Sequence, residues 1–311
     1  MENRANLAFT GIPTFCRTPT ISSLEDIEAD VAVIGIPFDE GVGFRPGTRF
    51  GPRSIREYSM RFPFFDPLSK NRGYWDLQKK QQLLTRLRMV DCGDVDIVMQ
   101  DLPYVHRQID ESIKKILEKG AFPVSLGGDH SITYPVVRAF EGKGPLSVVH
   151  LDAHLDRYPS VMDAKYGHGC PIRRIGELDF IEEIISIGLR GIRGRRADFR
   201  EAESRGEILI PSYLIQESGV DEIAEGIPRM GKCYVTIDID VFDPSLAPGT
   251  GTPEAGGLDY FQVKNVLSRI AEKSSIVGFD VVEVNPYFDD SGRTSLLAAQ
   301  LIVEFLGTLL G

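Results

Sequence analysis

Residues 146–156 read LSVVHLDAHLD, an apolar run that ends in acidic and histidine side chains. A short, nearly continuous apolar run is typical of a strand buried on both faces of a parallel sheet, so we predict a strand at residues 146–152. Open α/β sheets bind their ligands at the carboxyl ends of the strands. Asp152, His154 and Asp156, which end this run, are therefore the first candidates for a functional site.

The rest of the chain alternates similar apolar runs with helical patterns, which is typical of a parallel sheet covered by helices on both faces. The other predicted strands are residues 31–36, 87–91, 122–126, 184–189, 208–211, 233–239 and 276–282. The predicted helices are residues 52–58, 103–119, 131–140, 260–272 and 295–310. Because no linker or internal repeat divides the sequence, we predict one α/β domain over residues 1–311, with three α/β/α layers around a mostly parallel eight-stranded sheet.

The amino-acid composition indicates which binding partners and which cellular compartment to expect. The 311 residues include 35 Lys and Arg against 45 Asp and Glu, a net charge of −10, which disfavours nucleic acid and suits a small cationic substrate. The four scattered cysteines form no Cys-x-x-Cys pair and favour a reduced, cytoplasmic setting. We expect no signal peptide, and no membrane span at residues 295–311, a short stretch interrupted by Gln300 and Glu304.

Metal-ligand side chains gather at three predicted strand ends. The six candidates are His130, Asp152, His154, Asp156, Asp238 and Asp240. Because side chains alternate along an extended chain, we expect residues 152, 154 and 156 to project to one side, and residues 238 and 240 likewise. Each residue alone is equally compatible with a helix cap or a turn, but the whole set favours convergence. We assign His150 to the opposite side of its strand, as a packed histidine.

Four carboxylates and two imidazoles cannot be buried together without compensating charge. Two divalent cations that share bridging carboxylates would supply it and would still leave room for water and substrate. The oxygen-rich, thiol-free set favours manganese, while the imidazoles also admit zinc, nickel or cobalt.

Five separated segments carry a resemblance to a known family. They are SLGGDHS (125–131), HLDAHLD (150–156), DIDVFDP (238–244), GTGTPEAGGL (249–258) and VVEVNP (281–286). The sequence resembles the ureohydrolases, or arginase family, and most of all their agmatinase branch. The resemblance covers nearly the whole chain and implies the arginase-like three-layer fold.

The resemblance also implies a ligand set for two Mn²⁺ ions. One ion would be held by His130, Asp152, Asp156 and Asp238, and the other by Asp152, His154, Asp238 and Asp240. The family forms homotrimers or homohexamers, which we expect here as well.

The same resemblance implies residues for catalysis and substrate binding. A guanidinium carbon resists water at neutral pH, so the reaction needs a water activated by the cations. His168 matches the family's proton shuttle, and its near-neutral intrinsic pKa suits that task. Glu283 matches the carboxylate that grips the guanidinium, and Thr252 a hydroxyl beside it. Without the family match, these three would equally be a loop histidine, a strand-end charge and a turn residue.

The expected reaction cleaves a linear guanidino compound to urea and an amine, with agmatine, which would give the polyamine putrescine, as the first candidate. Arginine is disfavoured because residues 158–166 contain no Asn of the kind arginases use to hold an α-amino acid. Cys170 stands where the family usually has Thr or Ser. An arginine-rich stretch, residues 190–200, is typical of a solvated face or a subunit contact, and the alternative is that it favours acidic substrates. Guanidinobutyrate, guanidinopropionate or proclavaminate hydrolysis therefore stays an alternative, as does a non-catalytic ureohydrolase-like subunit.

Overall fold

The computed structural model describes residues 7–67, 72–161 and 163–311. Its centre is an eight-stranded sheet in the order β4-β1-β5-β10-β9-β6-β7-β8, in which every neighbouring pair is parallel. The strands are β1 (Val31–Ile36), β4 (Met89–Asp94), β5 (Phe122–Gly127), β6 (Leu146–Leu151), β7 (Ile181–Leu189), β8 (Ile208–Pro211), β9 (Lys232–Asp238) and β10 (Ser275–Val282). The prediction of a parallel eight-stranded α/β/α fold is confirmed.

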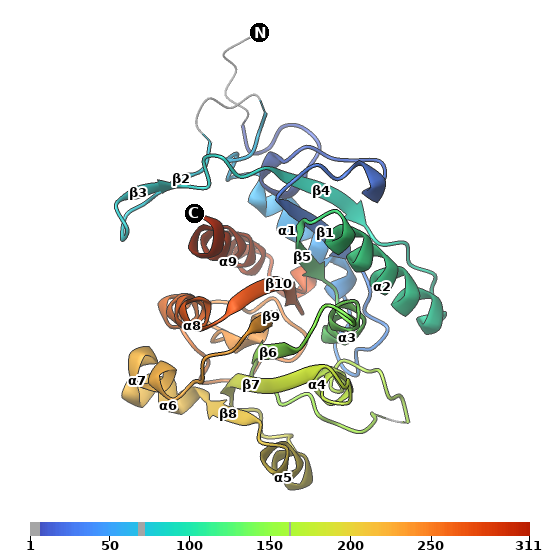
Figure 1. The fold of residues 1–311 in the computed structure, drawn as a ribbon, viewed down its shortest axis with the longest axis vertical. Helices are drawn as coiled ribbons and strands as arrows, with labels where there is room; N and C mark the ends of the chain where they lie inside the picture. The colour runs from blue at the N-terminus through green and yellow to red at the C-terminus, as the bar shows by residue number, and fades with distance from the viewer. Residues whose placement is uncertain (1–6, 68–71, 162) are drawn as a thin grey trace.

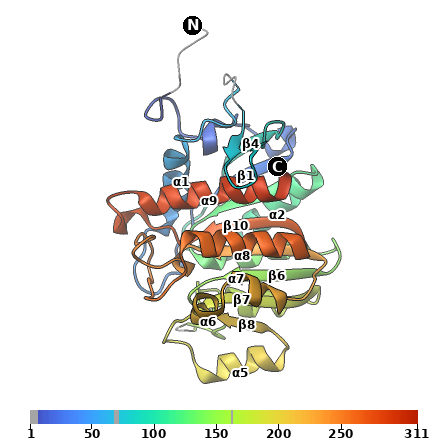
Figure 2. The same cartoon turned by 90° about the vertical axis from the view of Figure 1, so that its left-hand side faces the viewer.

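Helices cover both faces of this sheet (Figures 1 and 2). The α-helices are α1 (Gly51–Ser59), α2 (Leu102–Glu118), α3 (Thr133–Arg138), α4 (Pro171–Ile175), α5 (Arg196–Ser204), α6 (Ser212–Ser218), α7 (Val220–Glu225), α8 (Tyr260–Lys273) and α9 (Arg293–Leu310). Short 3-10 helices lie at Phe15–Arg17, Leu24–Asp26, Thr48–Phe50, His130–Ile132, Ile239–Val241 and Pro286–Phe288.

Alternation along the strands builds one core on each face. In β1, Val31 and Val33 pack into the core under α8 and α9, whereas Ala32 and Ile34 pack into the core under α2 and α3. Apolar side chains leave from both sides of the central strands, which is why these strands read as unbroken apolar runs.

The predicted boundaries differ most where apolarity is a poor guide. Strand β4 begins and ends later than the predicted residues 87–91. Its pairing with β1 runs from Met89 to Asp94 and includes the polar residues Asp91 and Asp94, which an apolar pattern does not mark. The predicted helix 131–140 divides into a 3-10 turn, His130–Ile132, and α3. Sequence reasoning missed α4 to α7 and a small antiparallel pair, β2 (Tyr74–Asp76) with β3 (Gln81–Leu83), which are short and largely polar.

The most apolar helix, α9, lies against the sheet rather than apart from it. It passes a length and hydropathy test for a membrane span, but 56% of that window is buried inside the protein. It packs against α1, α8 and β10, and ten of its residues are buried. Contact with this core accounts for its apolar sequence.

Candidate active site

The four central strands, β5, β10, β9 and β6, end at the same edge of the sheet, and every sequence-predicted metal ligand follows or ends one of three of them. His130 follows β5, residues 152–156 follow β6, and Asp238 ends β9. Glu283 directly follows the fourth strand, β10. The strand order also reverses between β9 and β6, since β6 leads to β7 on one side and β9 to β10 on the other. Open α/β sheets place their ligands at the carboxyl ends of strands beside such a reversal.

A close backbone contact sets the position of the His130 segment. A Cβ on Gly128 would lie 1.9 Å from the carbonyl oxygen of Phe38, so only glycine fits there. The Gly128 N–H donates to the carbonyl of Ile36 at 3.0 Å, and Asp129 N–H donates to the carbonyl of Phe38 at 2.8 Å. The chain after β5 is thereby held against the chain after β1.

Turns, rather than strand alternation, bring the carboxylates together. Strand β6 ends at Leu151, and Asp156 lies in the left-handed region at φ 50°. Asp240 lies in a 3-10 turn, and its backbone N–H donates to Asp238 Oδ1 at 2.8 Å. The expectation that these residues share one side of an extended strand is therefore wrong in its reason, although the side chains do converge.

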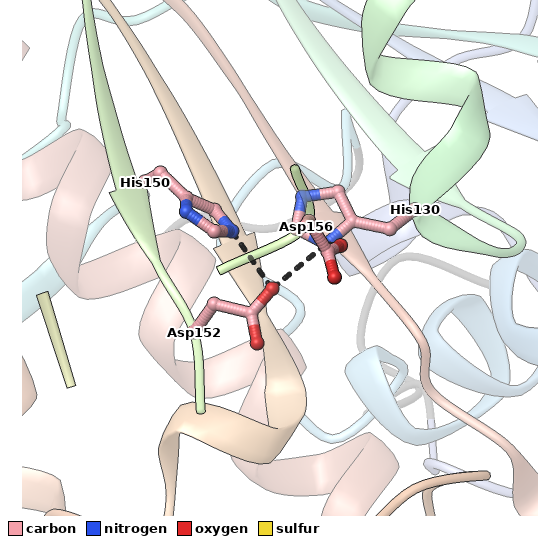
Figure 3. A group of neighbouring side chains, drawn as sticks. All are labelled: His130, His150, Asp152 and Asp156. Atoms are coloured by element: carbon pink, nitrogen blue, oxygen red, sulfur yellow. Dashed lines mark hydrogen bonds and ion pairs between the residues drawn. The ribbon is translucent and has the colours of Figure 1, made fainter. Parts of the chain in front are cut away.

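His130 is the centre of a first group of ligand atoms. Its Nδ1 lies 3.1 Å from Asp152 Oδ2, 3.3 Å from Asp156 Oδ2 and 3.1 Å from Asp238 Oδ2. Figure 3 shows the Asp152 and Asp156 carboxylates turned toward this ring. One nitrogen carries at most one proton, so it cannot donate to three carboxylates at once.

The other ring nitrogen fixes which atom of His130 is available. Nε2 lies 2.9 Å from Thr236 Oγ1, and the Thr236 hydroxyl donates to buried Asp280 Oδ1 at 2.6 Å. Since that hydroxyl proton is committed to Asp280, the ring donates its Nε2 proton to Thr236 and presents a lone pair at Nδ1. A lone pair facing three carboxylate oxygens fits a shared cation, because ligands about 2.1 Å from an ion lie about 3 Å apart.

His154 organises a second group beside the first. Its Nδ1 lies 3.3 Å from Asp152 Oδ1 and 3.1 Å from Asp240 Oδ2. Asp152 therefore contributes one oxygen to each group, as a carboxylate that bridges two cations would. The structure thus brings all six predicted ligands into two adjoining sets.

The protonation preferences of the cluster show what charge it lacks. Burial, with the charge of Asp152, raises the pKa of Asp156 to about 8. Burial, with the neighbouring carboxylates, also raises the pKa of Asp238 well above its usual value. Burial alone would lower the pKa of His154, but Asp240 and Asp152 raise it strongly. Each of these three shifts favours added positive charge. Burial would also raise the pKa of Asp152, but the neighbouring histidines lower it, so positive charge is what this cluster of carboxylates needs, and the residues fit divalent cations.

His150 does not point away from the cluster. Residues two apart on a strand share a face, and His150 Nε2 lies 2.7 Å from Asp152 Oδ2 (Figure 3). Its Nδ1 lies 3.1 Å from Ser186 Oγ, and the ring is fully buried. The assignment of His150 to the opposite side is wrong: it orients the bridging carboxylate.

Glu283 points one free oxygen into the site. Oε1 accepts the N–H of His130 at 2.9 Å and faces His168 Nδ1 at 3.0 Å, whereas Oε2 is buried without a hydrogen-bond partner among the described residues. The backbone at Glu283 has φ 63°, a conformation that non-glycine residues adopt at a cost of about 1–3 kcal/mol. Its N–H donates to the carbonyl of Gly128 at 2.8 Å, which helps to hold this strained geometry.

His168 is held by a loop that sequence reasoning did not connect with it. Its backbone N–H donates to the carbonyl of Gly41 at 3.1 Å, and the nitrogen of Gly43 lies 3.2 Å from Nε2, to which its N–H donates when that ring nitrogen is unprotonated. Asp129 Oδ2 in turn accepts the N–H of Gly41 at 2.8 Å. Burial, the largest single effect, lowers the pKa of His168, but Glu283, Asp129 and Asp156 together outweigh it and raise the pKa to about 9.

A pocket lies over the metal-ligand cluster and reaches solvent. Thr252 lines it, and its hydroxyl lies 3.4 Å from Asp240 Oδ2, at the edge of hydrogen-bonding distance. Beyond the cluster the wall is formed by apolar and basic residues of the chain after β6 and β7, including Tyr158, Phe199, Arg190 and Arg193.

The fold and this cluster define a class of three-layer α/β/α proteins. Their ligands for two cations lie at the carboxyl edge of a parallel sheet, beside a buried carboxylate oxygen without a partner among the described residues. Residues 29–307 match the arginase family model, and the chain belongs to the arginase family. It is 38% identical to the mitochondrial guanidino acid hydrolase of Homo sapiens over 96% of this chain and 83% of that one. It is 37% identical to the mitochondrial agmatinase of Gallus gallus, over 97% and 86%.

A solved structure gives the same answer for the fold. The proclavaminate amidino hydrolase of Streptomyces clavuligerus matches with a TM-score of 0.86 at 33% identity, over 98% of this chain and 99% of that one. The chain is therefore an arginase-family hydrolase that acts on a guanidino C–N bond. The family depends on a binuclear metal centre, and the donor set described above fits one.

Proposed function

We propose that the protein hydrolyses a linear guanidino compound to urea and an amine, using two divalent cations, with Mn²⁺ the first candidate. One observation carries the proposal: Glu283 lines the same pocket as members of both ligand groups, and its buried Oε2 has no hydrogen-bond partner among the described residues. A buried acceptor beside a cation cluster suits a planar, cationic guanidinium.

The chain's own residues divide the work at the cluster. His130, Asp152, Asp156 and Asp238 would hold one cation. Asp152, His154 and Asp240 would hold the other, with Asp238 as the fourth ligand that the family resemblance implies. When bound, such cations supply Lewis acidity that lowers the pKa of water from 15.7 to about 7. Thr236 and His150 keep the ligands in orientation, because Thr236 holds the far nitrogen of His130 and His150 contacts Oδ2 of Asp152.

Glu283 and His168 act on the substrate. Glu283 Oε2 accepts a guanidinium N–H and fixes the carbon in line with the cluster. The departing amine needs a proton, and His168, protonated up to a pKa of about 9, holds one at neutral pH. Thr252, at the rim of the cluster, would accept a remaining guanidinium N–H at its hydroxyl oxygen.

The sequence and the relatives support two substrate classes. Agmatine, cleaved to putrescine and urea, is the first candidate from the motifs, and two relatives are named agmatinase. The guanidino acids are the alternative, and other relatives are named guanidino acid hydrolase, guanidinobutyrase and guanidinopropionase. Cytoplasmic location and a homotrimer or homohexamer remain predictions, and a non-catalytic subunit is the rival reading.

The test is urea release from a panel of guanidines. Metal is stripped by chelation, and Mn²⁺, Ni²⁺, Co²⁺ or Zn²⁺ is added back singly, with metal content measured for each sample. We expect urea only from reloaded enzyme, and a lower melting temperature after stripping, because a ligand that binds only the folded state stabilises it. Undiminished turnover by verified metal-free enzyme would overturn the two-cation proposal, and metal binding with no turnover on any guanidine would favour the non-catalytic subunit.

A further inference from the structure

Four charged side chains line the pocket away from the cation cluster, His168 and Glu283. They are Arg157, Arg190, Arg193 and Asp198. They decide what charge the pocket accepts at the far end of a linear guanidine, so the partners of each matter.

Arg190 and Arg157 are already committed to the protein. The Arg190 guanidinium donates to backbone carbonyls of residues 188, 240–242 and 254–255, at distances of 2.6–3.4 Å. Arg157 is 1% exposed, and its charge is balanced by Glu207 at Nη1 and by Glu201, 3.7 Å from Nη2, although its Nε and Nη2 form no hydrogen bond with the described residues. Both serve to hold loops around the pocket.

Asp198 is committed as well. Its two carboxylate oxygens accept from Nε and an Nη of Arg195, at 2.7 and 2.6 Å. A bidentate pair of this kind satisfies the carboxylate and leaves no free anion for a substrate ammonium group. Agmatine would carry such an ammonium, and among the described residues that line the pocket away from the cluster, no other carboxylate is present to receive it.

Arg193 differs from all three. Its side chain is exposed, and within residues 7–67, 72–161 and 163–311 it has no hydrogen bond or ion pair. Its backbone, by contrast, is fixed, because the Tyr158 hydroxyl donates to its carbonyl at 2.6 Å. The next residue, Gly194, lies so close to Phe199 that a Cβ would be 2.5 Å from the ring. A free guanidinium thus stands on an anchored segment at the pocket wall.

We propose that Arg193 is the specificity-determining residue of this pocket and that it binds the carboxylate of a linear guanidino acid. The inference rests on the proposed function, since it assumes that the substrate's guanidinium sits at Glu283. A guanidinium pairs with a carboxylate through two parallel hydrogen bonds and repels an ammonium. The pocket then recognises a substrate by opposite charges at its two ends.

The experiment compares three substrates on metal-loaded enzyme. They are 4-guanidinobutyrate, agmatine and n-butylguanidine, which share a four-carbon chain and end in an anion, a cation and no charge; guanidinoacetate and guanidinopropionate extend the acid series to find the preferred length. We expect the best acid to exceed agmatine in kcat/KM. In Arg193→Ala the acid should lose roughly 10- to 100-fold, largely through KM, because a hydrogen bond to a charged group is removed. Butylguanidine should change little, and Arg193→Glu should reverse the preference toward agmatine.

Arg200→Ala is the matched control, since it removes an equally exposed arginine of the same stretch that does not line the pocket. It should leave all three substrates unchanged. The proposal is overturned if agmatine matches or exceeds the acids in the wild-type enzyme, or if Arg193→Ala weakens all substrates equally. Absence of urea from every substrate would instead overturn the proposed function, so the two failures are distinct.

Discussion

Two regions of the pocket are built in opposite ways: its floor, formed by the metal-ligand cluster, and its mouth, the part of the wall that carries exposed Arg193. At the floor, Asp152, Asp238 and His130 are at most 3% exposed, and each is fixed by strand ends, turns and a further hydrogen-bond partner. At the mouth, Arg193 is exposed and rests on loop backbone alone. The difference separates reaction from selection: floor residues meet the part common to all guanidines, whereas mouth residues meet the part in which guanidines differ.

The largest effect is expected from a change at the floor. In Asp240→Asn we expect bound metal and turnover to fall together, by roughly 100-fold or more, and equally for every substrate, because even indirect partners of metal ligands cost 10- to 100-fold. Metal analysis and urea assays check this. Asp243→Asn is the control from the same motif, since Asp243 accepts N–H bonds from Ser245 and Gly257 outside the cluster. Full metal content with lost activity would contradict the ligand role of Asp240.

His168→Ala tests the proton donor, and the expected loss is roughly 100-fold in turnover with metal content preserved. The wild-type rate should decline as pH rises through the pKa of His168, which is about 9 without cations and lower when they are bound, because only the protonated ring supplies the proton. The substrate guanidinium does not titrate in this range. The variant should lack this alkaline limb, and a limb that persists unchanged would assign it to another group.

The smallest effect tests the link between the floor and the Gly41–Gly43 loop. A Cβ on Gly41 would lie 2.9 Å from Asp129 Oδ2 and 3.2 Å from His168 N, whereas one on Gly43 would meet only His168 Nε2, at 3.9 Å. Gly41→Ala should therefore lower turnover roughly 10-fold for all substrates by displacing His168, and Gly43→Ala should stay near wild type. Equal effects of the two substitutions on kcat would show that the loop does not position His168.

The sequence predicts those strands and ligand positions that depend on the order of apolar and polar residues within a short segment. Apolar runs mark the eight strands, and the polar residues that end them mark the candidate ligands, because parallel strands share one carboxyl edge. The error at His150 was one of local geometry: residues 150 and 152 share a face, and the hydrogen bond between them follows from that.

What sequence reasoning could not supply depends on contacts between distant segments. The Gly43 contact to His168 joins loops 125 residues apart, and Thr236 acts on His130 from another strand. Likewise Arg190 and Arg193 look alike in the sequence, and only their tertiary surroundings show that one is bound to backbone carbonyls and the other is free.

Strand β10 has a consequence for how the chain is synthesised and folds. It follows the other seven strands of the sheet in the chain, yet it lies at the centre, between β5 and β9. Until residues 275–282 leave the ribosome, these two apolar strands expose unpaired inner edges, which are prone to aggregation. The sheet therefore cannot close before residue 282 has been made, and the inner edges of β5 and β9 stay unpaired while the earlier strands are synthesised.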